Sequence, residues 1–548
     1  MAGHEAQWGN WANLNAGRKG YISDAIHSLA VGDATTATNN EQGNSWAIES
    51  YFGRLNYNLL DRYLLTATLR ADGSSSFGPN NRWGWFPSAA AAWRINNEPF
   101  MQGTKDWLSN AKLRVGWGLV GNQQIGNYAY GVKMGTKLTA SGTGYYSANY
   151  ANKDLKWEST KAWNLGLDLA FLNNRIEFIV DWYYKNTDNL LMEGVLPGYV
   201  ISEGVKTPPT LNAGGVRNTG IEFTLNSVNI DKSDWKWRTA ATLSFNRNKV
   251  TALSGGKSLT KEIPYIEGVY TITEVGSPIS QFYGYNVIGM FCKEDDFYQK
   301  NKHGEFLLDA NGDRIPVARP VDEKGLIDIK PNGIWVGDYI FEDVNKDGKI
   351  TESDRKVIGN PLPDFTFGLN NSISYKNVEV SFFISGSVGN DVYNVLQQQK
   401  TNPSGWGNKM SFVSNYAKIA MYDKDGSLSD IKNVYVSNPG TAECWRMEPS
   451  GSNQNKNGRV SSKYVEDGSY VRLKSLSIGW NLPKRWLDKV GIEWCQLYAN
   501  AQNLFTITGY DGYDPEIGSM GQNVLLQGLD NGRYPSQRIF NCGIKLNF

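Results

Sequence analysis

The feature that most constrains the fold of this chain is an alternation of apolar and polar residues with a period of two, kept over long segments. In residues 163–171 the odd positions are large and apolar, whereas the even positions are polar or small. The same alternation returns at 63–70, 176–185, 365–370 and 378–385. Successive side chains of a β-strand point to opposite faces of its sheet, so each segment has one apolar and one polar face. The sequence therefore predicts an all-β chain of amphipathic strands.

Strand length and aromatic placement favour a membrane barrel over a soluble β-sandwich, which would alternate in the same way. The strands expected at 175–189 and 235–248 far exceed the average of about five or six residues, and a tilted membrane strand needs about nine to eleven. Aromatic residues gather near strand ends, where a membrane barrel carries its interface girdles. They are Trp157, Trp163, Trp182, Tyr183, Tyr184, Trp235 and Trp237.

The connections between the expected strands alternate between two length classes. Short links lie at 60–61, 172–174, 231–234 and 376–377. Long loops are expected at about 122–160, 187–216, 251–364, 390–469 and 508–537. Short periplasmic turns and long extracellular loops are typical of a bacterial outer-membrane barrel. We therefore expect a transmembrane antiparallel β-barrel in the outer membrane of a Gram-negative bacterium.

The strand count predicts that the barrel is only partial. Residues 1–45 are expected to be the remnant of an extracellular loop before the first clear strand, and residues 46–548 are expected to form the barrel wall. Counting back from the last strand makes the first clear strand, at 45–59, run toward the periplasm, so the number of strands is odd. A complete bacterial barrel has an even number.

Composition argues against nucleic-acid binding and against catalysis. The chain has 55 Lys and Arg against 54 Asp and Glu, so no net field attracts nucleic acid. The three histidines, His4, His27 and His303, stand in loop-like surroundings without a nearby nucleophile, and a catalytic triad needs a base held by an orienting group. Four cysteines without CxxC spacing make a zinc site unexpected. We expect no catalytic residues and no enzymatic activity.

The last residues of the chain form one more alternating segment. Apolar residues recur at every second position from Phe540 to the terminal Phe548. A soluble edge strand that ended bare and apolar would invite aggregation. The segment resembles the terminal signal that the barrel-assembly machinery reads in outer-membrane proteins. The expected signal residues are Phe540, Ile544, Leu546 and Phe548.

Residues 343–354, with the sequence DVNKDGKITESD, fit a twelve-residue calcium loop. Gly348 permits the sharp turn at position 6, and position 12 is Asp354 rather than the usual Glu, which is too short for the bidentate reach. We expect a weak structural Ca²⁺ site that stiffens an extracellular loop. The alternative is a turn rich in Asp and Asn without metal. The expected ligands are Asp343, Asn345, Asp347, Lys349 through its carbonyl, Thr351 and Asp354.

Solute-binding residues are not identified by any motif. Loop aromatics are candidates for stacking on sugar rings, although packing explains each of them as well. They are Tyr145, Tyr146, Tyr150, Trp335, Trp406 and Trp445. Polar residues of the inward face would line the lumen, or only hydrate and pair across strands. They are Arg70, Asp72, Asp168, Glu177 and Asp181.

Seven stretches resemble the SusC/RagA family of TonB-linked outer-membrane proteins, in the family's order. The last of them reads YPSQRIFNCGIKLNF. The stretches are residues 50–100, 111–130, 216–225, 337–370, 470–483, 497–516 and 534–548. The resemblance implies that this chain is the C-terminal barrel portion, about 13 to 16 strands of a barrel of about 22. An N-terminal part with the plug and the TonB box would then be missing.

The resemblance also implies a function and partners. Family members import nutrient oligomers, most often glycans and otherwise peptides, together with a SusD-like surface lipoprotein, and the TonB complex drives uptake through the N-terminal part. Two alternatives stay open for this chain. One is a passive outer-membrane porin or channel, and the other is a carbohydrate-binding β-protein without transport.

Overall fold

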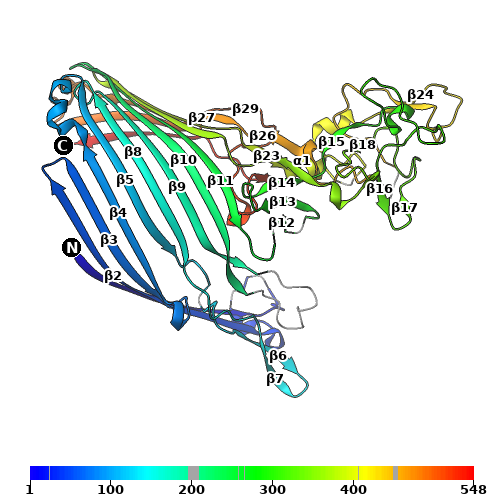
Figure 1. Cartoon of the computed structure of the whole chain (residues 1–548), viewed down its shortest axis with the longest axis horizontal. Coiled ribbons are helices and arrows are strands. Elements are labelled where there is room, and N and C mark those ends of the chain that lie inside the picture. The colour runs from blue at the N-terminus through cyan, green and yellow to red at the C-terminus, as the bar shows by residue number, and fades with distance from the viewer. Residues whose placement is uncertain are drawn as a thin grey trace. The chain divides into compact units, whose positions relative to one another are not determined.

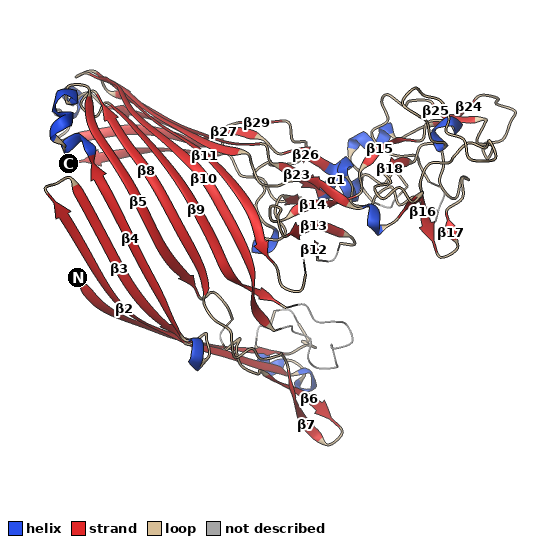
Figure 2. Cartoon of the chain, viewed as in Figure 1, coloured by secondary structure: helices blue, strands red, loops and turns tan. Residues whose placement is uncertain are grey.

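A computed structural model describes residues 1–23, 25–26, 28–126, 128–194, 209–256, 258–264, 266–404, 407–448 and 454–548. The chain divides into two compact units, which are considered separately. Unit 1 comprises residues 1–222 and 249–257, and unit 2 comprises 223–248 and 258–548. Strands dominate both units (Figure 2). Among the described residues no helix is long and apolar enough to cross a membrane.

Unit 1 is a wall of long strands that pair with their neighbours in chain order (Figure 1). Each pair whose register is described is antiparallel. The strands are β1 (Ala2–Gly17), β2 (Thr38–Leu59), β3 (Tyr63–Ser74), β4 (Trp83–Arg94), β5 (Leu108–Asn122), β8 (Glu158–Phe171), β9 (Ile176–Glu193) and β10 (Thr210–Asp231). A separate hairpin consists of β6 (Met134–Thr139) and β7 (Gly142–Ser147). Short 3₁₀ helices lie at Leu29–Val31, Ala34–Thr36, Pro79–Asn81, Ile95–Asn97 and Pro99–Thr104.

Unit 2 carries a second stretch of wall. Strand β10 enters this unit after Glu222, and the pairing order continues with β11 (Trp235–Ala252), β21 (Phe365–Tyr375), β22 (Val378–Val388), β27 (Tyr470–Asn481), β28 (Trp494–Gln502) and β31 (Ile539–Asn547). A further strand, β29 (Thr506–Thr508), pairs with β27 beside this path. The α-helix α2 (Lys484–Leu487) lies in the connection from β27 to β28.

The long connections of unit 2 fold into small sheets of their own. One contains β12 (Ser258–Glu262), β13 (Val269–Glu274), β14 (Gln281–Gly284) and β20 (Lys356–Gly359). In another, β16 (Arg319–Asp322) lies between β17 (Gly325–Leu326) and β19 (Lys349–Ile350), and in a third β23 (Asp391–Asn394) lies between β26 (Val465–Asp467) and β30 (Leu529–Asp530). Two-stranded pairs join β15 (Val287–Met290) to β18 (Tyr339–Phe341) and β24 (Ile419–Met421) to β25 (Val434–Val436). The helical pieces are α1 (Val395–Lys400) and 3₁₀ turns at Glu294–Phe297, Glu352–Asp354, Ser411–Asn415, Ser462–Tyr464 and Met520–Gln522.

The pairing register of unit 1 places the apolar residues of neighbouring strands in rows on one face. In β3 the residues at odd positions from 63 to 69 are exposed, and those at even positions are partly covered. Contiguous exposed apolar rows mark a surface that meets lipid or another apolar partner rather than water. One row crosses six strands through Leu55, Ala67, Ala89, Trp117, Trp163 and Tyr184. A parallel row runs through Tyr57, Leu65, Ala91, Val115, Leu165 and Trp182.

The short links form tight turns, as the alternation predicts. Leu60 and Asp61 both have positive φ, at 55° and 54°, which is the conformation of a two-residue hairpin turn that matches the strand twist. Residues 172–174 and Lys376 also have positive φ. Residue Met1 lies against β2, because its amino group donates to the Arg54 carbonyl at 2.9 Å.

The expectation that residues 1–45 form a loop remnant was wrong. Residues Ala2–Gly17 form β1, which pairs along its whole length with β2, and β2 itself begins at Thr38. Among the described residues the wall sheet has 15 strands, 14 on one pairing path and β29 beside it, which lies within the expected range of about 13 to 16. The strand escaped detection because Ala, Gly and Asn occupy most of its positions, so its side chains show little alternation. Backbone hydrogen bonds to β2 define it instead.

The long connections of unit 2 have apolar cores, which distinguishes them from simple loops. One core packs Tyr270, Phe282, Tyr393 and Tyr464 together. A second contains Phe291 and Phe297, whose rings stack at 4.2 Å. A third core forms around Tyr285, Phe341 and Trp445. Buried aromatic clusters of this kind give the connections a defined shape.

The expected loop at 187–216 is shorter than predicted, since β9 extends to Glu193 and β10 begins at Thr210. Residues 195–208 lie outside the described residues.

We expect a charge on the apolar face of the wall to block insertion, while the same charge on the polar face is tolerated. Leu69 is exposed on the apolar face at the middle of β3, and Thr68 is its neighbour on the opposite face. Leu69→Lys should cost about 2–4 kcal/mol if the position is near the bilayer midplane, and Thr68→Lys should cost little. The folded fraction in bilayers, read as heat-modifiable migration in electrophoresis, measures both variants. Equal losses for the two variants would contradict the assignment of the faces.

Candidate functional site: the polar wall and the folded loops

The polar face of unit 1 carries a charged cluster centred on Arg114. Its guanidinium lies 2.6 Å from Asp168 Oδ1 and 3.0 Å from Asp181 Oδ1, and its Nε donates to both oxygens of Asp168 at 3.0 Å. These residues come from β5, β8 and β9, so the cluster crosses three strands. Arg70 makes a similar pair with Asp72 at 2.7 Å and donates to Ser50 Oγ at 2.8 Å. Of the expected inward residues, Arg70 and Asp72 thus pair within β3, whereas Asp168 and Asp181 both pair with Arg114 across strands.

Unit 2 also carries a charged cluster, which is centred on Arg472 of β27. The side chain of Arg472 is almost fully buried. It donates to Thr506 Oγ1 at 2.8 Å and to Glu516 Oε2 at 2.8 Å, and it also bonds Asp514. Burial alone would raise the pKa of Asp514, but the bond from Arg472 and the N–H groups of Ser536 and Glu516 outweigh it and hold that pKa at about 2. Lys474 lies beside Glu516 in the same group. The carboxylates and cations here neutralise one another.

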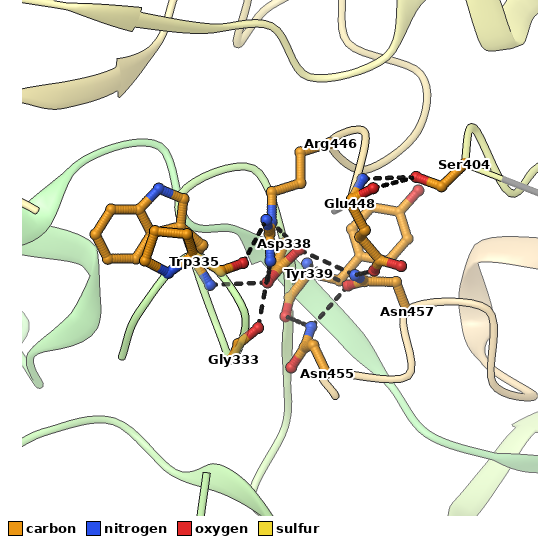
Figure 3. Close-up of polar contacts among 10 residues, drawn as sticks. Gly333, Trp335, Asp338, Tyr339, Ser404, Arg446, Glu448, Asn455 and Asn457 are labelled. Atoms are coloured by element: carbon orange, nitrogen blue, oxygen red, sulfur yellow. Dashed lines mark hydrogen bonds and ion pairs between the residues drawn. The ribbon is translucent and has the colours of Figure 1, made fainter. Parts of the chain in front are cut away.

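A buried polar network joins distant segments of the folded loops (Figure 3). Arg446 donates from Nε to Asp338 Oδ1 at 2.8 Å and from Nη2 to Asp338 Oδ2 at 3.2 Å. Its remaining bonds go to the carbonyls of Pro331 and Gly333 at 3.0 and 3.2 Å. Asp338 also accepts from the Trp335 N–H at 2.8 Å. Since both charged groups are shielded from water, each depends on the other, and losing one would leave an uncompensated buried charge.

Asn457 extends this network to Glu448. Its side-chain amide donates to Asp338 Oδ1 at 3.0 Å and to Glu448 Oε1 at 2.9 Å, while its oxygen accepts from the Tyr339 N–H at 2.9 Å. The Glu448 N–H donates to Ser404 Oγ at 2.6 Å. The network's charged and amide groups are buried and bonded to one another, so the network holds the loops together. No sequence motif signals it, because Asp338 and Arg446 stand 108 residues apart.

The residues expected to bind calcium form a closed turn. Asp343 accepts from the N–H groups of Asp347 and Gly348 at 3.2 and 2.9 Å, and Asp347 accepts from the Lys349 N–H at 2.8 Å. Gly348 has φ of 77°, as the sharp turn at position 6 requires.

Asp354 closes the other end of the same turn. It is fully buried and accepts from the N–H groups of Val344 and Thr351 at 3.0 and 2.7 Å. In the described part of the chain no three His, Cys, Asp or Glu side chains converge as a metal site would require. The Ca²⁺ site stays a prediction.

Of the loop aromatics that were candidates for stacking on sugars, two are excluded by burial. Trp335 and Trp445 lie inside the apolar cores of unit 2. Tyr145 is exposed on the β6–β7 hairpin, and Trp406 lies outside the described residues. Exposed Tyr513 and Tyr534 are aromatic candidates that the sequence did not single out.

The terminal strand β31 pairs with β28 and exposes its apolar row. Ile544 stands opposite Leu497, and Leu546 opposite Cys495. Phe540, Ile544, Leu546 and Phe548 are all exposed. The row is therefore available for recognition, and its role as an assembly signal stays a prediction.

All four cysteines are free thiols, so Cys292 and Cys444 form no disulfide.

A wall of long antiparallel strands with one exposed apolar face, one charged face and large folded loops defines an outer-membrane-type β-barrel protein. Residues 2–278 match the family described as TonB dependent receptor-like, beta-barrel, and the chain belongs to this family. The resemblance to SusC/RagA proteins is confirmed by the relatives below.

Curated relatives span nearly the whole chain. TonB-dependent receptor P3 of Formosa agariphila is 32% identical over an alignment of 545 residues that covers 97% of this chain and 49% of the relative. TonB-dependent receptor SusC of Bacteroides thetaiotaomicron is 32% identical over 509 residues, covering 91% of this chain and 43% of SusC. A solved structure titled the RagAB peptide transporter matches with a TM-score of 0.76 at 23% identity, over 100% of this chain and 53% of that one. The chain thus spans about half the length of the relatives it matches.

We expect the stability of the folded loops to fall as pH rises from about 4.5 to 7. Burial raises the pKa of Glu448 to about 7, and the Asn457 bond only partly opposes it. In this window folded Glu448 keeps a proton that the unfolded chain has released, so deprotonation costs on the order of 2 kcal/mol, and the loss levels off above pH 7. Limited proteolysis at pH 5 and pH 7.5 measures this loss of stability. Glu448→Gln should remove the pH dependence, whereas Glu443→Gln, an exposed control, should retain it. A pH dependence that Glu448→Gln leaves unchanged would refute its assignment to Glu448.

We expect Asp354→Ala to loosen the turn at residues 343–354 whether or not calcium is present. The variant loses hydrogen bonds to a buried carboxylate, which are worth about 1–3 kcal/mol in total or more. Proteolytic cleavage within the turn measures the effect. Calcium-dependent protection that Asp343→Ala abolishes, and that Asp309→Ala in a similar exposed turn leaves intact, would establish the metal site. Protection equal in calcium and in chelator would exclude it.

Proposed function

We propose that this chain provides barrel wall and extracellular loops of a TonB-dependent importer for nutrient oligomers in the outer membrane of a Gram-negative bacterium. Glycans are the first cargo class and peptides the second. The observation that supports the proposal is the two-faced wall, with apolar rows outside and the paired charges of Arg114, Asp168 and Asp181 on the other face, in a chain of this family. A charged inner face suits a water-filled or plugged lumen.

The proposed partners follow from the same family. A SusD-like surface lipoprotein would bind at the folded loops, the TonB complex would act through an N-terminal part of the transporter, and the barrel-assembly machinery would read β31. The folded loops of unit 2 support the first of these, because apolar cores and the Asp338–Arg446 network give a binding surface a lasting shape. The solved RagAB structure is that of a peptide transporter, which is why peptides remain the second cargo class.

Uptake of labelled oligomers by cells that carry the whole transporter tests this function. We expect uptake of one oligomer class to stop when the gene is deleted or when the proton-motive force is collapsed, because energised import needs TonB. Uptake that persists without the proton-motive force would instead favour a passive channel. Binding of oligomers with no uptake in either condition would favour a carbohydrate-binding protein without transport.

A further inference from the structure

The folded loops of unit 2 enclose a cavity of about 640 Å³ that the network of Figure 3 does not use. Its walls come from β13, β16 and β19, from the end of the 343–354 turn, and from residues 454–460. This volume is in the range of small-molecule sites, about 300–1,000 Å³. The cavity can therefore take a ligand of one or two sugar units.

Arg459 is the distinctive group of this cavity. Its guanidinium carbon lies 4.5 Å from the ring centres of both Tyr285 and Phe341, so two aromatic rings contact the cation. Its Nε and Nη2 donate to the carbonyls of Lys456 and Asn455 at 3.1 and 2.7 Å. Arginine has five N–H donors, so donors remain for a ligand. The side chain is held in place before any ligand arrives.

Within the described part of unit 2, Arg459 has no carboxylate within ion-pair distance. The side chain is partly buried, and this burial lowers the pKa of Arg459. Two almost fully buried arginines of the same unit, Arg446 and Arg472, each have an aspartate partner. A cation held beside a cavity without an anionic partner can bind the anionic group of a ligand.

The charged side chains around Arg459 give the lining of the cavity a net positive charge. Arg355 also lines the cavity and pairs with Glu352 at 2.8 Å. Lys456, which is exposed, has no ion-pair partner among the described residues. Glu267 is the remaining carboxylate of the lining. Among the described residues, the side chains of Glu267 and Gln454 make no hydrogen bond, so both can pair with ligand hydroxyl groups.

We propose that this cavity binds an acidic sugar, with the sugar carboxylate on Arg459 and Lys456 and its hydroxyl groups on Glu267 and Gln454. A planar carboxylate matches the guanidinium fork. A peptide would need a free strand edge for backbone pairing. Of the lining strands, β13 and β16 have partners on both sides, and the edge strand β19 has only two residues, too few to pair an extended peptide, which argues against a peptide. The inference deepens the proposed import function and rests on it for its biological meaning.

Equilibrium binding to the full chain in detergent tests the site apart from transport. Digalacturonate, a disaccharide with two carboxylates, is the probe, and calorimetry or ligand-observed NMR measures its affinity. We expect Arg459→Gln to weaken binding about 10- to 100-fold. Arg314→Gln is the matched control, because Arg314 also stacks on aromatic rings of unit 2 but lies outside the cavity, and it should leave binding unchanged.

A second variant guards against a folding defect in Arg459→Gln. Lys456→Gln leaves the stacked guanidinium in place and should weaken binding about 2- to 5-fold, with unchanged heat-modifiable migration. A neutral disaccharide should bind at least about 10-fold more weakly than digalacturonate. Equal binding of both disaccharides, stronger binding of triglutamate peptide, or an affinity that Arg459→Gln leaves intact would overturn the proposal. If digalacturonate does not bind but oligomer uptake still requires the proton-motive force, the acidic-sugar site is rejected and the import function stands.

Discussion

The structure depends on the pairing of backbone N–H and carbonyl groups between neighbouring strands. In the hydrocarbon of a bilayer no water is available to these groups, so each strand must satisfy its neighbour. The long antiparallel registers of the wall meet this demand, and β1 shows how far it extends, since that strand pairs fully with β2 although its side chains alternate little. Once the backbone is paired, the period of two decides the faces. Apolar rows face one side, and paired charges such as Arg114 with Asp168 face the other.

The folded loops follow a different physical rule from the wall. They are stabilised by small aromatic cores and by buried polar groups that pair with one another, as in a soluble protein. Asp338 and Arg446 illustrate the arrangement, since every charge is matched and the surrounding carbonyls take the remaining donors. Arg472 with Asp514 repeats it next to the wall. Arg459 departs from it, and this departure at the edge of a cavity is why a ligand is inferred there.

The turn at residues 343–354 shows how one sequence pattern serves two physical purposes. Asp and Asn at alternate positions can coordinate Ca²⁺, and the same oxygens can accept backbone N–H groups of a tight turn. Here Asp343, Asp347 and Asp354 all accept such bonds. The same turn contains Thr351 and Glu352, which line the cavity beside Arg459. Its rigidity therefore bears on the shape of that cavity.

The sequence by itself determined the wall, because the period of two and the short turns are local properties of the chain. The alternation at 63–70, the turn at Leu60 and Asp61, and the terminal row ending at Phe548 could all be read from neighbouring residues. The start of β1, the aromatic cores and the Asp338–Arg446 pair could not, because they arise between residues far apart in the chain. Burial likewise decided between sugar stacking and packing for Trp335 and Trp445, which pack in apolar cores. Only the tertiary structure decided which polar groups find partners, since pairing depends on distances that no local pattern encodes. It left Arg459 beside a cavity with carbonyl and aromatic partners but no carboxylate partner among the described residues.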